Sequence, residues 1–326
     1  MWPPREAVGA ALCGRPEGFI EQGRPYVAAR RGIYTMNKTT PLKFVLYVVL
    51  ILLSGIFLFP IIITVVNSFM SPFEIVNRYS SVITAANGFD TAGPIHFVEM
   101  ALIPGFVSFK QYFQLLFGKP LYLGLFWNSL KITLPIVIGQ LLVSVPGAYA
   151  FELSKFKYKE AVFFVYIVVM LMPLQVVLVP HYIMAGFLGI KESYLAIILP
   201  GIFNPFGVFL MRQYLKSLPK DYIEAAKIDG ASHLQILSYI IAPMIKTAAA
   251  ALLILTFVEY WNLVDQAIVF IKEARQEPLS AYLSRFAEGG LDIVFAASCF
   301  YMLPTVLIFL YGQENIVEGI QLSGMK

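Results

Sequence analysis

Long runs without charge constrain this chain more than any other feature of its sequence. Five of them lie between the charged residues Lys43 and Glu74, Lys131 and Glu152, Glu160 and Lys191, Glu192 and Arg212, and Asp292 and Glu314. Each is close to or above the roughly 20 apolar residues that a helix needs to cross a bilayer core of about 30 Å. A sixth run after Lys246 ends at Glu259, so it crosses only with a carboxylate in its outer part. We therefore predict an all-α, polytopic membrane protein with six transmembrane helices.

The composition supports this fold class. Hydrophobic residues make up 58% of the chain and charged residues 13%, against about 45–50% apolar and about 25% charged in soluble domains. Such a balance excludes a disordered chain, an ordinary cytosolic enzyme, and a nucleic-acid binder that works through a basic face. Membrane lipid is the expected surrounding. The predicted spans cover residues 43–70, 130–151, 161–181, 194–212, 244–266 and 293–313.

The distribution of basic residues predicts the orientation. Cytoplasmic loops carry the excess of lysine and arginine. Basic residues gather in the N-terminal segment, between the second and third predicted spans at Lys155, Lys157 and Lys159, and between Arg212 and Lys246. Six spans place both termini on one side of the membrane. We therefore expect both termini to be cytoplasmic, together with the segment between the fourth and fifth spans.

Residues 1–35 differ from the rest of the chain. They are rich in Arg, Gly, Ala and Pro, whereas the sequence after Met36 is rich in Ile, Leu, Phe, Lys, Asn and Tyr. They have no apolar core of a signal peptide, and their glutamates argue against a transit peptide. We interpret 1–35 as an atypical N-terminal extension with translation beginning at Met36. The transmembrane domain is then expected over 36–326.

Residues 217–243, SLPKDYIEAAKIDGASHLQILSYIIAP, predict a short helix followed by a glycine turn. Asp221 and Glu224 place negative charge near the positive end of that helix. Gly230 suits the left-handed conformation that ends many helices.

A second short helix is predicted directly after the turn. Ser232 and Gln235 have the spacing of a capping box. The residues expected on its apolar face are Leu234, Leu237 and Ile241, with Ile236 and Ile240 beside them. From these residues alone, 217–243 is either an element that docks on a partner or a hairpin that lies on lipid.

The sequence resembles the permease subunits of bacterial ABC importers. EAAKIDGA, residues 224–231, with Ile240 and Pro243 behind it, resembles the EAA signature of that family. Further similar stretches are FWNSLKIT, GAYAFELSKFK, LMPLQVVLVPHYIMAGFLGI, FGVFLMRQYL and the tail IVEGIQLSGMK. The resemblance runs from about Met36 to the end and looks closest to the second permease of maltose-type sugar importers. Ala242 and Leu263 depart from the family, which usually has leucine and an acidic residue there.

The resemblance implies a function and its partners. It implies a subunit of the bacterial-type plasma (inner) membrane that moves a carbohydrate or similar polar solute into the cytoplasm. The implied partners are an ABC ATPase dimer, a second six-span permease, and an extracytoplasmic solute-binding protein that meets the loop 271–292. The chain has no G-x-x-x-x-G-K-[ST] motif, so we expect no catalysis and no cofactor here, with ATP and Mg bound by the partner ATPase. Transmission of ATPase motion is expected from Glu224, Ala225, Ala226, Asp229, Gly230 and Ala231.

The fifth predicted span carries a polar stripe. Glu259, Asn262 and Gln266 recur at helical spacing and would share one face, with Trp261 adjacent. A carboxylate at the bilayer centre costs roughly 2.5–3.5 kcal/mol, so Glu259 should face protein or water. These four residues form the candidate translocation pathway, and the alternative is that they only join neighbouring helices.

Two other functions and a metal site are less well supported by the sequence. A secondary transporter would show repeated halves and several intramembrane carboxylates. A membrane-embedded enzyme would need a catalytic constellation. His96, His181 and His233 are scattered, without the spacing of metal ligands, so no metal site is expected.

Overall fold

A computed structural model describes residues 41–86, 102–118, 120–154, 156–219, 221–285 and 291–324. The predicted extension 1–35 and the start at Met36 lie outside these ranges. The chain divides into two compact units, Met1–Phe57 and Leu58–Lys326. In the first unit the structure describes the opening turns of a helix whose apolar side chains, from Phe44 to Phe57, are exposed. All packing below belongs to the second unit.

The described residues are helical, apart from turns and one isolated bridge between Met70 and Val107. In chain order the helices are α1 (Pro41–Asn67), α2 (Pro72–Ala86), α3 (Lys110–Phe113), the π-helical turn η2 (Gln114–Gly118), α4 (Pro120–Leu153), α5 (Lys159–Met170), α6 (Leu174–Phe187), α7 (Leu195–Ile202), α8 (Pro205–Ser217), α9 (Asp221–Ile228), α10 (His233–Gln235), the π-helical turn η3 (Ile236–Ile241), α11 (Ala242–Met244), α12 (Lys246–Trp261), α13 (Asp265–Phe270), α14 (Leu279–Ser284) and α15 (Leu291–Gly324).

Four helical segments in the described ranges are long and apolar enough to cross a membrane. They are Lys43–Asn67, Pro120–Leu153, Leu195–Ser217 and Ile293–Glu314. Two bent pairs raise the number to six if each pair counts as one span: Lys159–Met170 with Leu174–Phe187, and His233–Met244 with Lys246–Trp261. The helical class agrees with the sequence, and the number of crossings remains between four and six.

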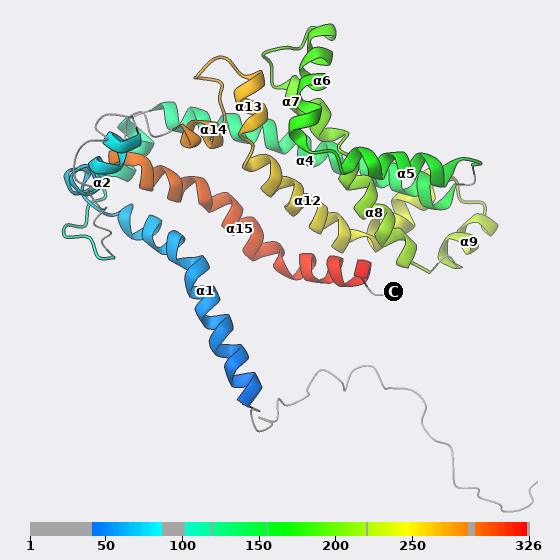
Figure 1. Ribbon diagram of the computed structural model, residues 1–326. Helices are drawn as coiled ribbons and strands as arrows, with labels where there is room; N and C mark the ends of the chain where they lie inside the picture. Colours follow the sequence, from blue (N-terminus) through cyan, green and yellow to red (C-terminus); the bar gives the residue numbers. More distant parts are fainter. Residues whose placement is uncertain are drawn as a thin grey trace, which may run out of the picture. The chain divides into compact units, whose positions relative to one another are not determined.

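The third predicted span is not a single helix. The expected helix over 161–181 is broken between α5 and α6, which meet at an angle of 101° (Figure 1). Pro173 lies at the break with an extended backbone, φ −65° and ψ 143°. Proline cannot donate the backbone hydrogen bond of a continuing helix and disfavours helical geometry in the residue before it. The sharp bend therefore follows from the local sequence.

The long helix α4 is central to the packing of the second unit. It contacts α7, α8 and α12, and α12 runs beside α15 (Figure 1). Gly207 of α8 lets that helix approach α4 closely, because a Cβ at this position would lie 2.1 Å from the Ser144 hydroxyl oxygen. Small residues permit such close approach between membrane helices. A buried hydrogen bond of 2.6 Å from the Thr256 hydroxyl to Gln140 Oε1 joins α12 to α4.

Candidate functional site

Residues 217–243, named the coupling hairpin here, turn at Gly230 with φ +78°. The amide of Ala231 donates to the carbonyl of Ala226 at 2.9 Å, and the amide of Gly230 donates to Lys227 at 3.1 Å. These two bonds form a Schellman motif, which satisfies the last carbonyls of α9. Since a left-handed backbone disfavours side chains with a Cβ, the structure confirms the predicted glycine turn.

The second arm of the hairpin begins with the predicted capping box. The Gln235 amide donates to the Ser232 hydroxyl at 3.4 Å, and the Ser232 amide donates to Gln235 Oε1 at 2.8 Å. The arm then continues as η3, with Ile236 and Ile241 both buried. The wider π-helical turn places residues five apart on the same side.

The faces of the hairpin separate packing residues from exposed ones. Ile223, Ala226, Ile236 and Ile241 are buried in a core with Met211 and Leu215 of α8. Glu224, Ala225, Asp229 and Gly230 are exposed, and Ala231 is half-buried. Ala226 and Leu234 lie on opposite sides of this division. Ala226 packs inward, whereas Leu234, one of the residues predicted on the apolar face, is 77% exposed. The register of η3 directs Ile236 and Ile241 at the core.

Polar contacts fix the base of the coupling hairpin. The Tyr149 hydroxyl and Nδ1 of His233 lie 2.8 Å apart, which joins α4 to the second arm. Arg212 of α8 is fully buried, and its guanidinium lies 2.6 Å from a Glu160 oxygen and 3.4 Å from a Glu152 oxygen. The guanidinium also lies 3.8 Å from the centre of the Phe163 ring. The second arm of the hairpin is thus attached to α4, and α8, from which the hairpin starts, is joined to the ends of α4 and α5.

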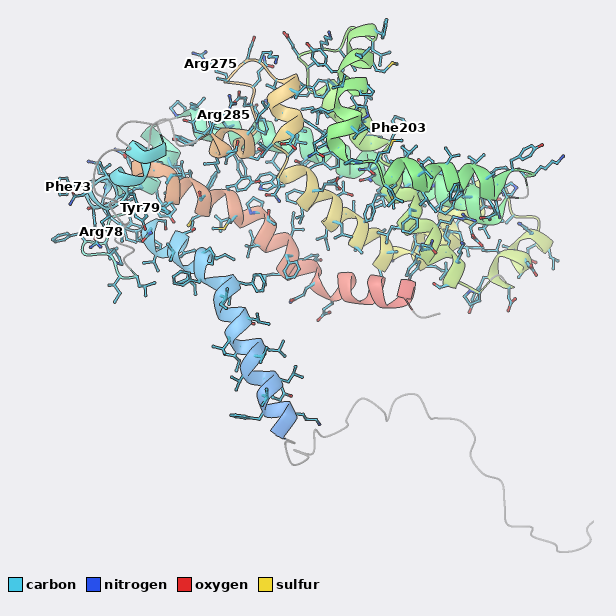
Figure 2. The ribbon with its side chains drawn as sticks, in the orientation of Figure 1. Phe73, Arg78, Tyr79, Phe203, Arg275 and Arg285 are labelled. Carbon is cyan, nitrogen blue, oxygen red and sulfur yellow. The ribbon has the colours of Figure 1, made fainter. Side chains whose placement is uncertain are left out.

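A cavity of about 770 Å³ lies among α5, α6, the α7–α8 junction, and the region where α12 ends and α13 begins. One wall is apolar and comes mainly from α5 and α6. The polar lining residues are Tyr166, His181, Asn204, Glu259, Tyr260, Asn262, Asp265 and Gln266. Phe203, which is exposed, lines the cavity at the α7–α8 junction (Figure 2).

Three of the four candidate pathway residues line this cavity, although they do not lie on one helix. Glu259, Asn262 and Gln266 all line it. They do not share one helical face, because α12 ends at Trp261 and Gln266 belongs to α13. The Asn262 amide donates its side-chain hydrogen bond to the carbonyl of Val258 at 2.8 Å. An asparagine side chain that competes for backbone groups in this way favours a helix end.

Trp261 does not join the other three candidate pathway residues. It is fully buried and is not among the cavity-lining residues. Its indole N–H donates to the carbonyl of Tyr301 at 3.1 Å, and its ring stacks on Phe257 and Tyr301. Its position in the structure is therefore in the core between α12 and α15.

The chain matches the family model described as "Binding-protein-dependent transport system inner membrane component" over residues 141–317. This match covers more than half of the chain and includes both the coupling hairpin and the cavity. The chain belongs to this family. It is therefore a multi-pass inner-membrane permease component, and membership implies that it works with an ATPase and a solute-binding protein.

Individual relatives agree with this assignment. The permease is 31% identical over 233 residues to the arabinooligosaccharides transport system permease protein AraQ of Bacillus subtilis, covering 70% of this chain and 83% of the relative. It is 30% identical over 198 residues to the lactose transport system permease protein LacG of Rhizobium radiobacter, covering 60% and 72%.

A solved structure shares the fold of the permease. It is a chain of a bacterial ABC transporter involved in the import of the acidic polysaccharide alginate. The two match with a TM-score of 0.69 and 23% sequence identity, over 84% of this chain and 96% of the other. The likeness establishes the fold.

Several lining residues of the permease were not predicted from its sequence. Asn204 directly precedes Pro205, which is an N-cap signal, and its side chain accepts from the Phe206 amide at 3.0 Å. The same side chain donates to the Tyr260 hydroxyl at 3.3 Å. No local pattern indicates that Phe203, Asn204 or Asp265 lines a cavity, because three separate segments have to meet to form it.

The loop after α13 is anchored to the core of the permease. The Asn128 amide donates to the carbonyl of Arg275 at 2.7 Å, and the Tyr194 hydroxyl donates to the carbonyl of Gln276 at 2.9 Å. Burial, with a smaller contribution from the Glu273 charge, raises the pKa of Tyr194 and keeps it a neutral donor. Arg285 pairs with the buried Glu277 (Figure 2 labels Arg275 and Arg285). Residues 286–290 of this loop lie outside the described ranges.

Metal binding finds no support in the described parts of the permease. Across them, no three His, Cys, Asp or Glu side chains are grouped so that they could hold a metal ion. His181 lines the cavity and His233 contacts Tyr149. His96 lies outside the described ranges.

Proposed function

We propose that this permease is one of two membrane-spanning subunits of an ATP-driven importer for a carbohydrate or a similar polar solute. The substrate class is supported by AraQ and LacG, whose names specify oligosaccharide and disaccharide transport. The second subunit is a similar permease, so that the pair is a heterodimer. An ATPase dimer binds ATP and Mg on the cytoplasmic side, where both termini of this chain lie.

The coupling hairpin carries the proposal. A transporter without its own ATP site needs a stiff element that reaches the motor, and the Schellman turn and capping box supply stiffness on both sides of Gly230. Glu224, Ala225, Asp229 and Gly230 are exposed around that turn and free to contact the ATPase. Ile228 and Leu234 are exposed beside them. Ala226 and Ala231 then set the position of the contact rather than making it.

The attachments of the hairpin give motion a route to the cavity. Movement at the ATPase reaches α8 through the buried face of α9 and passes from α8 to α4 and α5 through Arg212. It also reaches α4 directly through Tyr149. The α7–α8 junction and the end of α12 line the cavity. Closure of the motor would shift these helices and open the cavity outward, and opening of the motor would reverse the movement. Glu259, Asn262 and Gln266 are proposed to contact solute, whereas Trp261 holds α12 in place.

Purification and reconstitution test this function. The chain, tagged at its C-terminus, should copurify with an ATPase and a second permease in fixed ratio, identified by mass spectrometry. In proteoliposomes, saccharide uptake should require ATP and the solute-binding protein. Intact mass of the purified chain also tests the start at Met36. A lone, stable protein that transports without ATP would overturn the proposal and favour a secondary transporter.

A further inference from the structure

The described cavity is acidic. Its lining contains the carboxylates of Glu259 and Asp265, and it contains no lysine or arginine among the residues that the structure describes there. We propose that this cavity admits neutral or amine-bearing saccharides and rejects acidic ones such as uronic-acid oligomers. The inference rests on the proposed function and adds the charge class of its substrate.

Neither carboxylate is neutralised inside the described unit. No ion pair or hydrogen bond to the side chain of Glu259 or Asp265 is present in the described ranges. Three basic side chains of the described unit are engaged elsewhere. Arg212 pairs with Glu152 and Glu160, Arg285 pairs with Glu277, and the Lys191 ammonium lies 4.2 Å from the centre of the Tyr182 ring. A solute therefore meets two carboxyl groups that have no ion-pair partner in the described ranges.

The apolar wall of the cavity strengthens the field of these carboxyl groups, although the Glu259 and Asp265 side chains are themselves exposed. The charge interaction between two groups grows as the effective dielectric constant falls. The α5 and α6 side of the cavity is formed mainly by valine, methionine and leucine side chains, with Tyr166 and His181 among them. A carboxylate on a solute would meet repulsion there with no lysine or arginine in the described lining to offset it. An ammonium group would find two acceptors, and a neutral hydroxyl can donate to the same carboxylates.

The remaining lining suits a saccharide in particular. Asn204 is held in a fixed orientation by its bond to Tyr260, and Asn262 by its bonds to Val258 and Tyr301. Their remaining hydrogen-bonding capacity is therefore presented in a defined direction. The Phe203 ring offers a flat apolar surface for the C–H face of a sugar ring. The volume of about 770 Å³ lies within the about 300–1,000 Å³ typical of small-molecule sites. Such a site can bind hydroxyl groups through hydrogen bonds, and its charge selects among sugars.

Charged thiol reagents measure the field directly. In the reconstituted importer, with Cys13 and Cys299 replaced by alanine, Gln266→Cys places one thiol in the cavity and Ala274→Cys places one on the exposed outer loop. The rates of reaction with a cationic and an anionic methanethiosulfonate are then compared. The cation-to-anion rate ratio should be roughly tenfold higher at the cavity thiol. Adding Glu259→Gln and Asp265→Asn should bring the two ratios together. Equal ratios in the starting protein would overturn the inference.

Transport assays then test selection of saccharides. Uptake of lactose, a glucosamine disaccharide and a digalacturonate is compared in wild-type and Glu259→Gln/Asp265→Asn importers, with Glu273→Gln as control because it removes an exposed carboxylate outside the cavity. The same binding protein serves every variant, so a changed ratio belongs to the permease. The double variant should raise digalacturonate uptake relative to lactose at least about threefold, and the control should leave the ratio unchanged.

The two assays separate failure of this inference from failure of the proposed function. Saccharide uptake with an unchanged acid-to-neutral ratio in the double variant, or a wild-type preference for digalacturonate, overturns the inference alone. ATP-driven uptake of no saccharide in the panel, together with uptake of a different class of solute, overturns the carbohydrate function and the saccharide selection built on it.

Discussion

The coupling hairpin and the end of α12 are two short polar regions that differ in how they are built. In the hairpin, the determinants lie within a few residues of one another: Gly230 turns the chain and Ser232 caps the next helix. At the end of α12, Asn262 stops the helix, and neighbouring residues then separate, with Trp261 in the core and Asn262 in the cavity. A local motif can be read from sequence, whereas a shared lining depends on which distant helices meet.

This difference makes the two regions sensitive to different changes. Substitution in the hairpin should alter transmission to the ATPase with modest effects on folding, because its key residues are exposed. Substitutions at the end of α12 should have two kinds of effect. Those at core positions should lower stability, and those at cavity positions should change which solute is transported. Three variants test this contrast.

The largest effect is expected for Trp261→Ala. Removing a fully buried tryptophan that stacks on Phe257 and Tyr301 should lower the free energy of unfolding by about 3–5 kcal/mol. Thermal unfolding of the purified complex in detergent measures it. Trp127→Ala is the matched control, because that indole is more than half exposed, and it should change stability little. Full stability of Trp261→Ala combined with altered solute selection would return Trp261 to the translocation pathway.

The second-largest effect is expected for Gly230→Val, which should weaken coupling to the ATPase. A Cβ at this position meets no neighbouring atom, so the strain comes from the left-handed backbone alone and costs roughly 1–2 kcal/mol or more for a branched residue. We expect copurification with the ATPase to persist and solute-stimulated ATP hydrolysis to fall at least about tenfold.

Gly189→Val is the matched control for that variant. Gly189 also has a positive φ, +67°, with open space around its Cβ position, but it follows α6 outside the coupling hairpin. It should carry similar backbone strain and retain solute-stimulated hydrolysis. Equal loss in both variants would mean that general strain, rather than the hairpin, explains the result, and normal stimulation in Gly230→Val would remove the coupling assignment.

The smallest effect is expected for Ser232→Ala. Loss of an N-cap side chain costs about 1 kcal/mol, so the second arm should open roughly fivefold more often, as measured by amide hydrogen exchange over residues 233–237. Ser238→Ala is the control, since its hydroxyl donates to the Leu234 carbonyl within the same helix and caps nothing. Identical exchange in the two variants would show that the capping box does not hold the arm.

The sequence by itself determined the features that depend on neighbouring residues. Charge-free runs specify membrane helices, since lipid cannot satisfy charged groups or an open backbone. The glycine turn and the capping box follow from residues at most three positions apart. The sequence also contains Pro173 at the position of the break, but it does not predict the angle between α5 and α6, which is 101°.

Only the tertiary structure decided which side chains meet. The register of η3 directs Ile236 and Ile241 at the core and leaves Leu234 exposed, and Ala226 belongs to the buried face of α9. Glu259, Asn204 and Asp265 come from separate segments and line the same cavity, whereas Trp261 is buried between α12 and α15. These outcomes depend on how helices far apart in the chain pack together. Helical spacing fixes the angle between neighbours on one helix, and it carries no information about which surface each side chain will face.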